Sequence, residues 1–438
     1  MIFLGEFMNI AFHTLGCKVN QFETQALEIL LSQKNHTVTD DLSTADVIVV
    51  NTCTVTSVSD QKSRRIIRHF AKTYPNAKIA VCGCLSQLNP ESIREIPGVA
   101  LVSGTSDKHT FADKIDALSS VNAESFTLDK PLSRRSFEQL PAGGLHGHTR
   151  AMLKIEDGCC NFCSYCIIPY SRGPVRSMPM ADILAECKKI SEQAYREVVI
   201  TGIEISSYGR DLSPRASLED AVAMLCSEFP SIRFRLGSIE PRTITEAFCE
   251  KLKSFTNLCP HFHLSMQSGC DETLARMNRK YDTERFFESI SLLRRYFENC
   301  AITTDMIVGF PGETEDEFSK TLDFIEKCAF SSMHIFPYSK RNGTPAAKMP
   351  DQITKAEKSS RAKRASEIAK ALSENYLKEQ LGRTLSVLFE EVCDGFWSGH
   401  AMNYSRIYVK SEENLKNKTL DVYVTSLFRD GLCGEIVS

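Results

Sequence analysis

The 438-residue sequence has no long hydrophobic run, no strong excess of one charge sign and no export signal. No stretch approaches the roughly 18 apolar residues of a membrane span, which excludes a helical membrane protein. The net charge of −3 gives no sign of a nucleic-acid partner, so any basic surface has to be local. Residues 1–7 lack the parts of a signal peptide, and Met8 is the expected start. These absences predict a cytoplasmic protein without a membrane partner.

Cysteine, in contrast, is abundant, with 17 residues. The odd number and the missing export signal argue against a disulfide framework. In a reducing compartment, clustered cysteines indicate metal or redox chemistry instead. The remaining composition, 42% hydrophobic and 24% charged, is that of an ordinary globular protein.

Hydrophobic patterning over residues 8–118 predicts an α/β domain with a parallel sheet. Three short apolar runs, at 10–12, 47–50 and 78–81, are typical of strands covered on both faces. Helical patterns lie between them, and Asn20 with Glu23 three residues later is the expected cap of the first helix. Residues 119–148, rich in Ser, Asn, Pro and Gly, are interpreted as a linker.

The rest of the chain predicts two further domains. Residues 149–375 repeat strand then helix, which favours a partial (β/α)6 barrel. The six candidate strands are 152–155, 197–201, 233–237, 261–265, 302–308 and 333–336. A long helix is expected from Thr354 toward Gly382. Residues 376–438 end in short alternating strands, which predict a small antiparallel β-barrel.

A compact cysteine group follows the first barrel strand directly. Cys159, Cys163 and Cys166 form a CxxxCxxC pattern, with Cys160 as an extra that leaves a second ligand choice open. Iron–sulfur clusters usually take four cysteines, so three thiolates leave one iron open to a small molecule. Loops at the carboxyl ends of barrel strands are where active sites form. A structural zinc site would need a second cysteine pair, and none follows at a suitable spacing.

A second cysteine group is spread over the first domain. Cys17, Cys53 and Cys84 each follow one of its three apolar runs. The carboxyl ends of parallel strands meet at one edge of a sheet, so these thiols could form a second three-cysteine metal site. Three buried cysteines acting as small hydrophobes are an equal alternative. Cys82 lies within its strand, which makes Cys84 the better ligand.

The CxxxCxxC pattern with an aromatic residue before its last cysteine resembles the radical S-adenosylmethionine (SAM) superfamily. The resemblance implies a 4Fe–4S cluster whose open iron binds the amino and carboxylate groups of SAM, and cleavage that yields a 5′-deoxyadenosyl radical. It also implies cofactor-binding positions, with Tyr165 against the adenine, Thr201, Gly202 and Glu204 at the amino group, and Ile307, Gly309 and Glu313 on the adenine side.

Further motifs extend the resemblance over nearly the whole chain. TLGCKVNQFETQ, NTCTVT, GCLSQ, DGCCNFCSYCIIPYSRG, QSGCDETLARMNRKY, IVGFPGETEDEF and FPYSKRNGTPAA look like those of the methylthiotransferases. Cys160 is a departure, since that family usually has another residue there. The resemblance implies a second 4Fe–4S cluster on Cys17, Cys53 and Cys84, and a TRAM-like RNA-binding barrel at the C-terminus. It implies methylthio transfer to an adenosine in tRNA, with a sulfur donor and a reductant such as a flavodoxin or ferredoxin as partners.

The first motif also indicates a branch of that family. Lys18 after Cys17, and Glu23, resemble the branch that modifies N6-threonylcarbamoyladenosine beside the anticodon. Relatives that act on isopentenyladenosine, or on an aspartate of a ribosomal protein, more often read GCQMN or GCPKN there. Both stay as alternatives. An RNA-binding protein whose clusters sense oxygen or iron is the alternative from another class, and the cofactor motifs argue against it.

Several cationic residues are candidates for contacts with RNA or substrate. Residues 61–78 contain six cations and no acid, which suits phosphate contacts, although a solvated helix face is the common alternative. Tyr404, Arg406, Tyr408 and Lys410 offer stacking and phosphate contacts in the last domain, or are simply barrel surface and core. Arg172 and Arg176 follow the cysteine loop, and we hypothesise that they orient substrate or cofactor; ion-paired barrel residues are the alternative.

Overall fold

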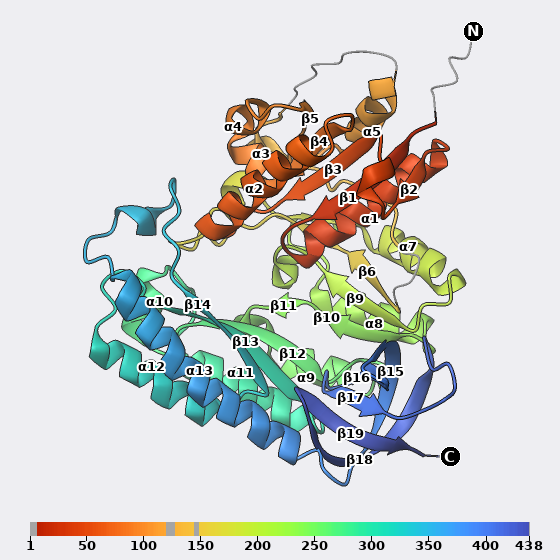
Figure 1. Cartoon of the computed structure of the whole chain (residues 1–438). Coiled ribbons are helices and arrows are strands. Elements are labelled where there is room, and N and C mark those ends of the chain that lie inside the picture. Colours follow the sequence, from red (N-terminus) through yellow and green to blue (C-terminus); the bar gives the residue numbers. More distant parts are fainter. Residues whose placement is uncertain (1–6, 120–127, 144–148, 438) are drawn as a thin grey trace.

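The computed structural model describes residues 7–119, 128–143 and 149–437. Its three parts follow one another along the chain, with the N-terminal α/β part above the central barrel and the small β-barrel at the base (Figure 1). Residues 1–6, which precede the expected start at Met8, residues 120–127 and 144–148 of the expected linker, and residue 438 lie outside the described residues. The mixed α/β fold class is confirmed.

The N-terminal part is a parallel sheet covered on both faces. Its strand order is β2-β1-β3-β4-β5, and every pairing in it is parallel. The strands are β1 (Asn9–Thr14), β2 (Thr37–Thr39), β3 (Val47–Thr52), β4 (Lys78–Gly83) and β5 (Val99–Val102). Helices α1 (Lys18–Gln33) and α5 (Lys108–Asp116) pack on one face; α2 (Ser57–Thr73), α3 (Cys84–Leu88) and α4 (Pro90–Arg94) pack on the other. Alternate strand residues enter the two cores, which explains why the strands read as continuous apolar runs.

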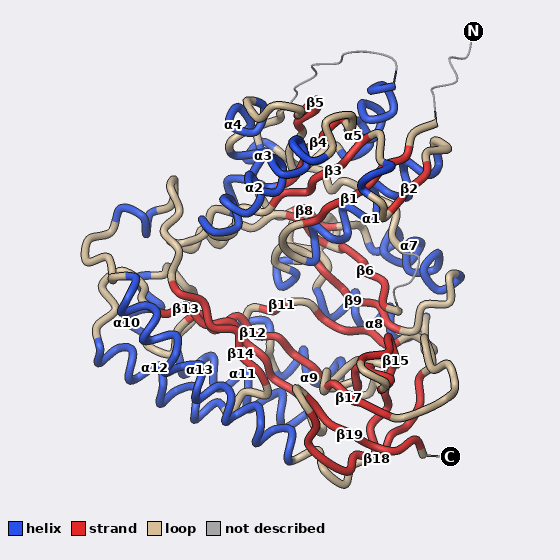
Figure 2. Tube along the Cα trace, viewed as in Figure 1, coloured by secondary structure: helices blue, strands red, loops and turns tan. Residues whose placement is uncertain are grey.

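The central part contains all six predicted strands in one curved arrangement (Figure 2). These are β6 (Arg150–Lys154), β9 (Glu197–Thr201), β10 (Arg233–Leu236), β12 (His261–Gln267), β13 (Ala301–Val308) and β14 (Ser332–Pro337). They form the runs β10-β9-β6 and β11-β12-β13-β14, and the short β11 (Ser238–Ile239) resumes the third strand after Gly237. The outer helices are α7 (Met180–Glu192), α8 (Leu218–Glu228), α9 (Glu246–Leu252), α11 (Thr283–Tyr296), α12 (Glu315–Cys328) and α13 (Lys355–Lys378).

The C-terminal part is a closed barrel of five strands in the order β15-β16-β17-β19-β18, with β18 pairing back to β15. The strands are β15 (Thr384–Cys393), β16 (Phe396–Ala401), β17 (Arg406–Val409), β18 (Thr419–Phe428) and β19 (Gly431–Ile436). The predicted barrel is confirmed, with one pair, β17 and β19, running parallel. Strand direction cannot alternate all the way around a closed ring with an odd number of strands, so one parallel pair is required.

A buried ion-pair cluster joins this small barrel to the central one. Glu197 is fully buried and accepts from Arg233 at 2.6 Å and from Arg235 at 2.8 Å. The same arginines donate to backbone carbonyls of the small barrel, including Met402 at 2.8 Å and His400 at 3.2 Å. Each buried charge is therefore paired and hydrogen-bonded, which is the condition for tolerating it in the interior.

Glu197 makes the stability of this interface depend on pH. Burial alone would raise its pKa, but the two arginines outweigh burial and lower the pKa from 4.5 to about 2. Because the folded-state pKa is depressed, the stabilisation is present above pH 4.5 and is lost as the pH falls toward 2, at about 3 kcal/mol in total. We expect the unfolding free energies of wild type and Glu197→Gln to differ at pH 7 and to converge as the pH falls from 4.5 toward 2. A gap that is independent of pH would contradict this account.

Residues 128–143 of the expected linker are packed between the first two parts. Arg134 donates to Gln87 at 2.9 Å in the N-terminal part, and to the Arg172 carbonyl at 3.2 Å in the central part. Asp129 neutralises Arg134 through a contact of 2.6 Å. This segment therefore fixes the first two parts against each other. The boundaries predicted at 118/119, 148/149 and 375/376 stay predictions.

None of the helices in the described ranges is both long and apolar enough to cross a membrane.

Candidate functional site

Two loops of the N-terminal sheet carry Cys17 and Cys53 to the same place. Asn20 donates to the Leu15 carbonyl at 2.8 Å and to the Thr52 carbonyl at 3.0 Å, which ties the loop before Cys17 to the residue before Cys53. Gly16 has φ +113°, and a Cβ there would lie 2.9 Å from the Cβ of Cys53. The glycine therefore allows both the backbone turn and the close approach of the two cysteine loops.

The expectation that Asn20 caps the first helix is wrong. Helix α1 begins at Lys18, and the backbone of Cys17 occupies the cap position without a side-chain hydrogen bond. The Asn20 amide is instead used to join the two loops, and Glu23 is fully buried against Arg172 of the central part. A capping pattern cannot reveal such partners because they lie outside the helix, on another strand end of the sheet and in the central part of the chain.

Cys84 completes the first group at the end of β4. It is the first residue of α3 and is buried, and both Cys17 and Cys53 lie near enough to raise the pKa of its thiol through charge repulsion. Burial is the larger cause, and together these effects raise the pKa of Cys84 to about 11. Cys82 packs inside the hydrophobic core beneath the sheet, which supports Cys84 as the ligand at this strand end.

The second cysteine group lies on the loop after β7 (Glu156–Asp157), which follows β6 directly. The Cys159 amide donates to Gly173 at 3.0 Å, and the Cys166 amide donates to Cys163 at 2.9 Å. Ser164 is held at 3.0 Å and 2.8 Å by backbone carbonyls of residues 276–277. The loop is therefore fixed on two sides, while Cys160 is exposed at its surface.

Arg279 is a site residue that the sequence analysis did not single out. Its guanidinium donates to the Sγ of Cys163 at 3.2 Å and lies 4.7 Å from the ring centre of Tyr281. A cation there stabilises a thiolate and would help to offset the negative charge of a thiolate-bound cluster. The only sequence signal was its place in the RMNRKY segment, because a lone arginine has no spacing pattern.

The two cysteine groups face each other across the junction of the first two parts. α3 packs against α6 (Ile168–Arg172), the helix that follows the second group. Burial and then neighbouring thiols raise the pKa of Cys166 to about 12, and Cys84 of the other group is one of those thiols. Two separate three-cysteine groups thus lie on the two sides of this junction.

Each group offers three cysteine thiols, the donors that hold the irons of an iron–sulfur cluster. Within the described ranges, no three His, Cys, Asp or Glu side chains converge closely enough to hold one ion. A cubane spreads its thiolates more widely because each one binds a different iron. The raised thiol pKa values mean that loading a cluster has to displace protons from Cys84 and Cys166.

Acidic side chains gather beside the second cysteine group, at the end of β9. The Glu204 amide donates to Glu156 at 2.7 Å, and a Cβ on Gly202 would lie 2.8 Å from the same carboxylate. Burial and then Glu240 raise the pKa of Glu204. Glu204 also contributes to the raised pKa of Cys159, so it lies near that thiol. Thr201 closes the strand and is buried. Such a carboxylate cluster complements a cationic amino group.

The predicted adenine-side residues fall into two groups. Tyr165 and Ile307 pack against the same small apolar cluster, and Tyr165 meets Phe310 edge to face at 6.4 Å. Glu313 is turned away: its carboxylate accepts from the Gly309 amide at 2.6 Å and pairs with Arg361 at 2.8 Å. Gly309, with φ +68°, makes the turn that this contact closes. The structure therefore brings Tyr165 and Ile307 together, whereas the Glu313 carboxylate links the Gly309 turn to Arg361.

Arg172 and Arg176 lie in a buried charge network rather than on an open surface. Arg172 is fully buried, donates to Asn20 at 2.8 Å and to Glu23 at 3.2 Å, and lies 3.5 Å from Asp157. Arg176 donates to the backbone carbonyls of Arg172 and Pro174 and lies 3.4 Å from Asp157. Cys84 is the largest of the favourable influences that raise the pKa of Arg172, so this cation also lies near the first cysteine group.

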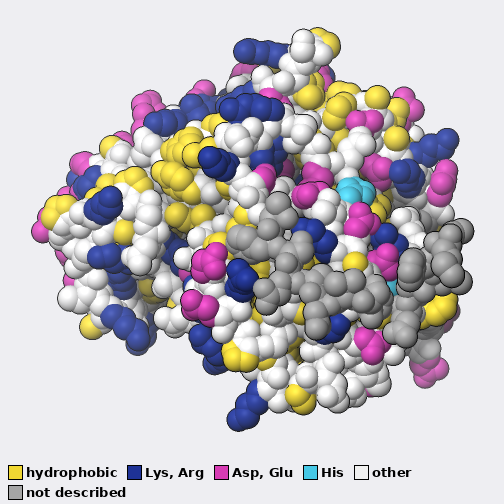
Figure 3. All heavy atoms as spheres, turned by 90° about the horizontal axis from the view of Figure 1, so that it is seen from above, with side chains coloured by type: hydrophobic (Ala, Val, Ile, Leu, Met, Phe, Trp, Pro, Cys, Tyr) yellow, Lys and Arg dark blue, Asp and Glu magenta, His cyan; other side chains and the backbone are white. Residues whose placement is uncertain are grey.

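The predicted basic segment is divided by the fold. Four cations, Lys62, Arg65, Arg68 and Lys72, are exposed on α2, whereas Lys78 lies on β4 and donates to the Leu118 carbonyl at 2.5 Å. Seen from above, this side of the molecule has Lys and Arg interspersed with Asp and Glu (Figure 3). A hollow of about 540 Å³ lies between α2 and α6, the helix that follows the cysteine loop, and is lined by Arg64, Tyr170 and Lys340, among others.

The candidate RNA residues of the small barrel divide in the same way. Tyr408 is buried, and its hydroxyl bonds to Asp430 at 2.5 Å; Arg406 pairs with Asp430 at 3.1 Å. Tyr404 stacks between His261 and His400 at 4.7 and 4.8 Å, facing the central barrel. Lys410 is exposed, 5.3 Å from the ring centre of Phe396.

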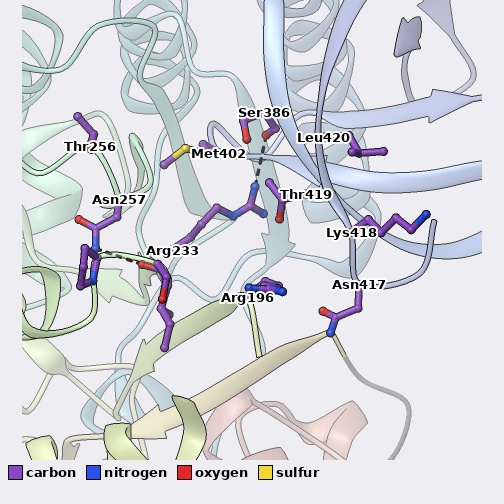
Figure 4. A pocket seen from close by; sticks show the side chains of 13 residues that line it. Arg196, Arg233, Thr256, Asn257, Ser386, Met402, Asn417, Lys418, Thr419 and Leu420 are labelled. Atoms are coloured by element: carbon purple, nitrogen blue, oxygen red, sulfur yellow. Dashed lines mark hydrogen bonds between the residues drawn. The ribbon is translucent and has the colours of Figure 1, made fainter. Parts of the chain in front are cut away.

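A separate hollow of about 550 Å³ lies between the two barrels and contains Arg196, Arg233, Asn257 and Lys418 (Figure 4). It opens at the amino ends of β9 and β10, whereas both cysteine groups follow carboxyl ends of strands. Chemistry in barrels of this type is carried by the carboxyl-end loops, so this hollow is not part of the candidate site.

Comparison with known proteins agrees with this geometry. Residues 153–325 match the radical SAM superfamily, and residues 9–104 match the uncharacterized protein family UPF0004. The chain is 37% identical to "Threonylcarbamoyladenosine tRNA methylthiotransferase MtaB" of Bacillus subtilis, covering 95% of this chain and 93% of the relative. It is 31% identical to "tRNA-2-methylthio-N(6)-dimethylallyladenosine synthase" of Acetivibrio thermocellus, covering 97% and 90% of the two chains.

Among solved structures, the fold is similar to the radical SAM methyltransferase TsrM of Kitasatospora setae. The TM-score is 0.57 at 13% identity, over 90% of this chain and 77% of that one. Membership of the superfamily implies a 4Fe–4S cluster and SAM. The identity and coverage shared with the curated relatives establish that this chain belongs to the radical SAM methylthiotransferase family.

Proposed function

We propose that this protein is a tRNA methylthiotransferase that converts N6-threonylcarbamoyladenosine next to the anticodon into its 2-methylthio derivative. The observation that carries the proposal is the pair of three-cysteine groups that face each other across the junction of two domains. One group alone serves cofactor cleavage. A second beside it supplies a place where sulfur can be held next to the same substrate.

The residues divide into two sets by position. Cys159, Cys163 and Cys166 would hold the cluster that binds SAM, with Arg279 beside Cys163. Glu204 and its carboxylate neighbours would hold the amino group, and Tyr165 and Ile307 would contact the adenine. Cys17, Cys53 and Cys84 would hold the second cluster, beside Arg172. SAM, when bound, supplies the methyl group and the one-electron chemistry that an inert aromatic C–H bond requires.

The substrate assignment is supported by the first cysteine motif and by the names of similar proteins. Three relatives at 35–37% identity are named for threonylcarbamoyladenosine, and relatives at 31–34% for dimethylallyladenosine. The exposed cations of α2 and the hollow beside the cysteine loop offer phosphate contacts for tRNA. The reaction also needs an electron donor, such as a flavodoxin or ferredoxin, and a sulfur donor.

Mass spectrometry of tRNA nucleosides tests the proposal. We expect a strain without this gene to lose 2-methylthio-N6-threonylcarbamoyladenosine and to accumulate its unmethylthiolated precursor. The intact gene should restore the product, and the Cys163→Ala gene should not. Loss of the methylthio form of isopentenyladenosine instead would support methylthio transfer to tRNA but identify isopentenyladenosine as the substrate. No change in either nucleoside would contradict tRNA as the target.

A further inference from the structure

A hollow of about 400 Å³ runs along α1, away from the first cysteine group. Lys18, Gln21, Gln25 and Glu28 of α1 line it, and their spacing of three or four residues places them on one helix face. The opposite wall comes from inner residues of β6, β9 and β10 and from Tyr404 of the small barrel. Lys18, the first residue of α1 and of this helix face, directly follows Cys17 of the first cysteine group in the sequence.

Within the described residues, one of the cations that line this hollow has no hydrogen-bond or ion-pair partner. Arg235 donates hydrogen bonds to Glu197 at 2.8 Å and to the Met402 carbonyl at 2.8 Å, and Arg150 forms an ion pair with Glu390 at 3.0 Å. Lys18 also lines the hollow near Arg150, Arg235 and Tyr404, and no described residue forms a hydrogen bond or ion pair with its ammonium group. Among the described residues that line the hollow, Glu28 is the only acid, and it lies at the opposite end of this helix face from Lys18. The hollow therefore presents an unused ammonium group beside Cys17.

The reacting atom of the substrate fixes what has to enter this space. Methylthio transfer takes place at adenine C2, and the exocyclic N6 is attached to the same six-membered ring, with only N1 and C6 between C2 and N6. Holding C2 at the first cysteine group therefore brings the N6 substituent close to Lys18. A threonylcarbamoyl group ends in a carboxylate and carries a hydroxyl, whereas an isopentenyl group has neither.

We propose that this hollow receives the N6 substituent of the substrate nucleoside and that Lys18 pairs with its carboxylate. This inference rests on the proposed function and adds a residue that determines substrate choice. Gln21 and Gln25 offer polar contacts for the hydroxyl and carbamoyl groups, while Met152 and Val199 offer an apolar wall for the methyl group. An ammonium–carboxylate contact in such a recess is a charge-assisted hydrogen bond, stronger than a neutral one.

The test varies the protein and the RNA together. Anticodon stem-loops carry N6-threonylcarbamoyladenosine, its neutral threonine-carboxamide analogue or isopentenyladenosine, and are bound to the full-length, cluster-loaded chain. We expect wild type to bind the acid RNA about tenfold more tightly than the carboxamide RNA. Lys18→Gln should lose that preference by weakening only the acid RNA. Lys18→Arg should keep most of it, and Lys363→Gln, a change of an exposed lysine on α13, should leave it unchanged.

Two results would overturn the inference while leaving the proposed function in place. One is equal binding of the acid and carboxamide RNAs by wild type, which needs no variant. The other is a Lys18→Gln chain that weakens both RNAs by the same factor. Wild type that methylthiolates only the isopentenyl RNA would overturn the proposed function and this inference together.

Discussion

Cys163→Ala is expected to abolish both 5′-deoxyadenosine formation and methylthio transfer, while the protein stays folded. Cys163 is buried on a loop held by backbone contacts that do not involve its thiol, and its Sγ accepts from Arg279. Removing one of three thiolates takes away a ligand that a cluster with one open iron cannot replace. The cysteines of the other group lie on separate elements of the N-terminal sheet, so roughly half of the iron should remain.

Cys84→Ala is the matched variant, and it should divide the two activities. We expect it to retain 5′-deoxyadenosine formation and to lose the methylthio product, because Cys84 belongs to the other group. Iron content, product formation and 5′-deoxyadenosine are measured on the same reduced preparations. Cofactor cleavage that survives Cys163→Ala, or that disappears with Cys84→Ala at unchanged iron on the second group, would contradict the division of roles.

Arg172→Ala is expected to lower stability by about 3–5 kcal/mol and to reduce turnover severely. Its guanidinium is fully buried and joins Asn20 and Glu23 of α1 to the helix after the second cysteine group. Removing it leaves Glu23 with only Lys154, at 3.4 Å, as a buried ion-pair partner, and removes a positive charge from the neighbourhood of Cys84. Denaturant unfolding and methylthio product formation measure the two effects.

Two further variants separate charge from packing at this site. Arg172→Met combined with Glu23→Gln removes both charges while keeping volume, and should recover much of the stability but not the turnover. Arg176→Ala should cost less stability, because Arg176 is held mainly by backbone carbonyls. Arg172→Ala and Arg176→Ala proteins that both keep wild-type stability, full turnover and intact clusters would show that neither arginine supports the site.

Much of the fold was predictable because it depends on local pattern. The three apolar runs of the N-terminal part and the six strands of the central part lie where hydrophobic periodicity placed them. Residues buried on both faces of a sheet must be continuously apolar, and that requirement is visible in any short window. Cys84 rather than Cys82 was preferred for the same reason, since a residue inside such a strand points into the core.

The partners of polar residues were not predictable, because they depend on distant segments. Asn20 and Glu23 matched a helix cap, yet they bind residues at Thr52 and Arg172. Glu313 matched a predicted position on the adenine side of the cofactor, and its carboxylate pairs with Arg361. Lys78 was grouped with the cations of α2 as a phosphate contact, yet it begins the predicted strand at 78–81 and donates to the Leu118 carbonyl. The sequence shows which side chains are charged or can form hydrogen bonds, but it does not show which distant group pairs with each of them.

The sequence by itself determined the family and its cofactor chemistry: the spacing of the CxxxCxxC group indicated one iron–sulfur site, and the longer motifs carried the resemblance. The cysteine after each apolar run left a second metal site and three buried cysteines as equal alternatives, and the resemblance alone implied a second cluster. Only the tertiary structure decided that the two groups face each other, that Arg172 and Arg134 join the parts that carry them, and that Lys18 lines a hollow beside Cys17. The physical reason is that ligand spacing is local along the chain, whereas the approach of two domains depends on buried contacts between residues that lie far apart in the sequence.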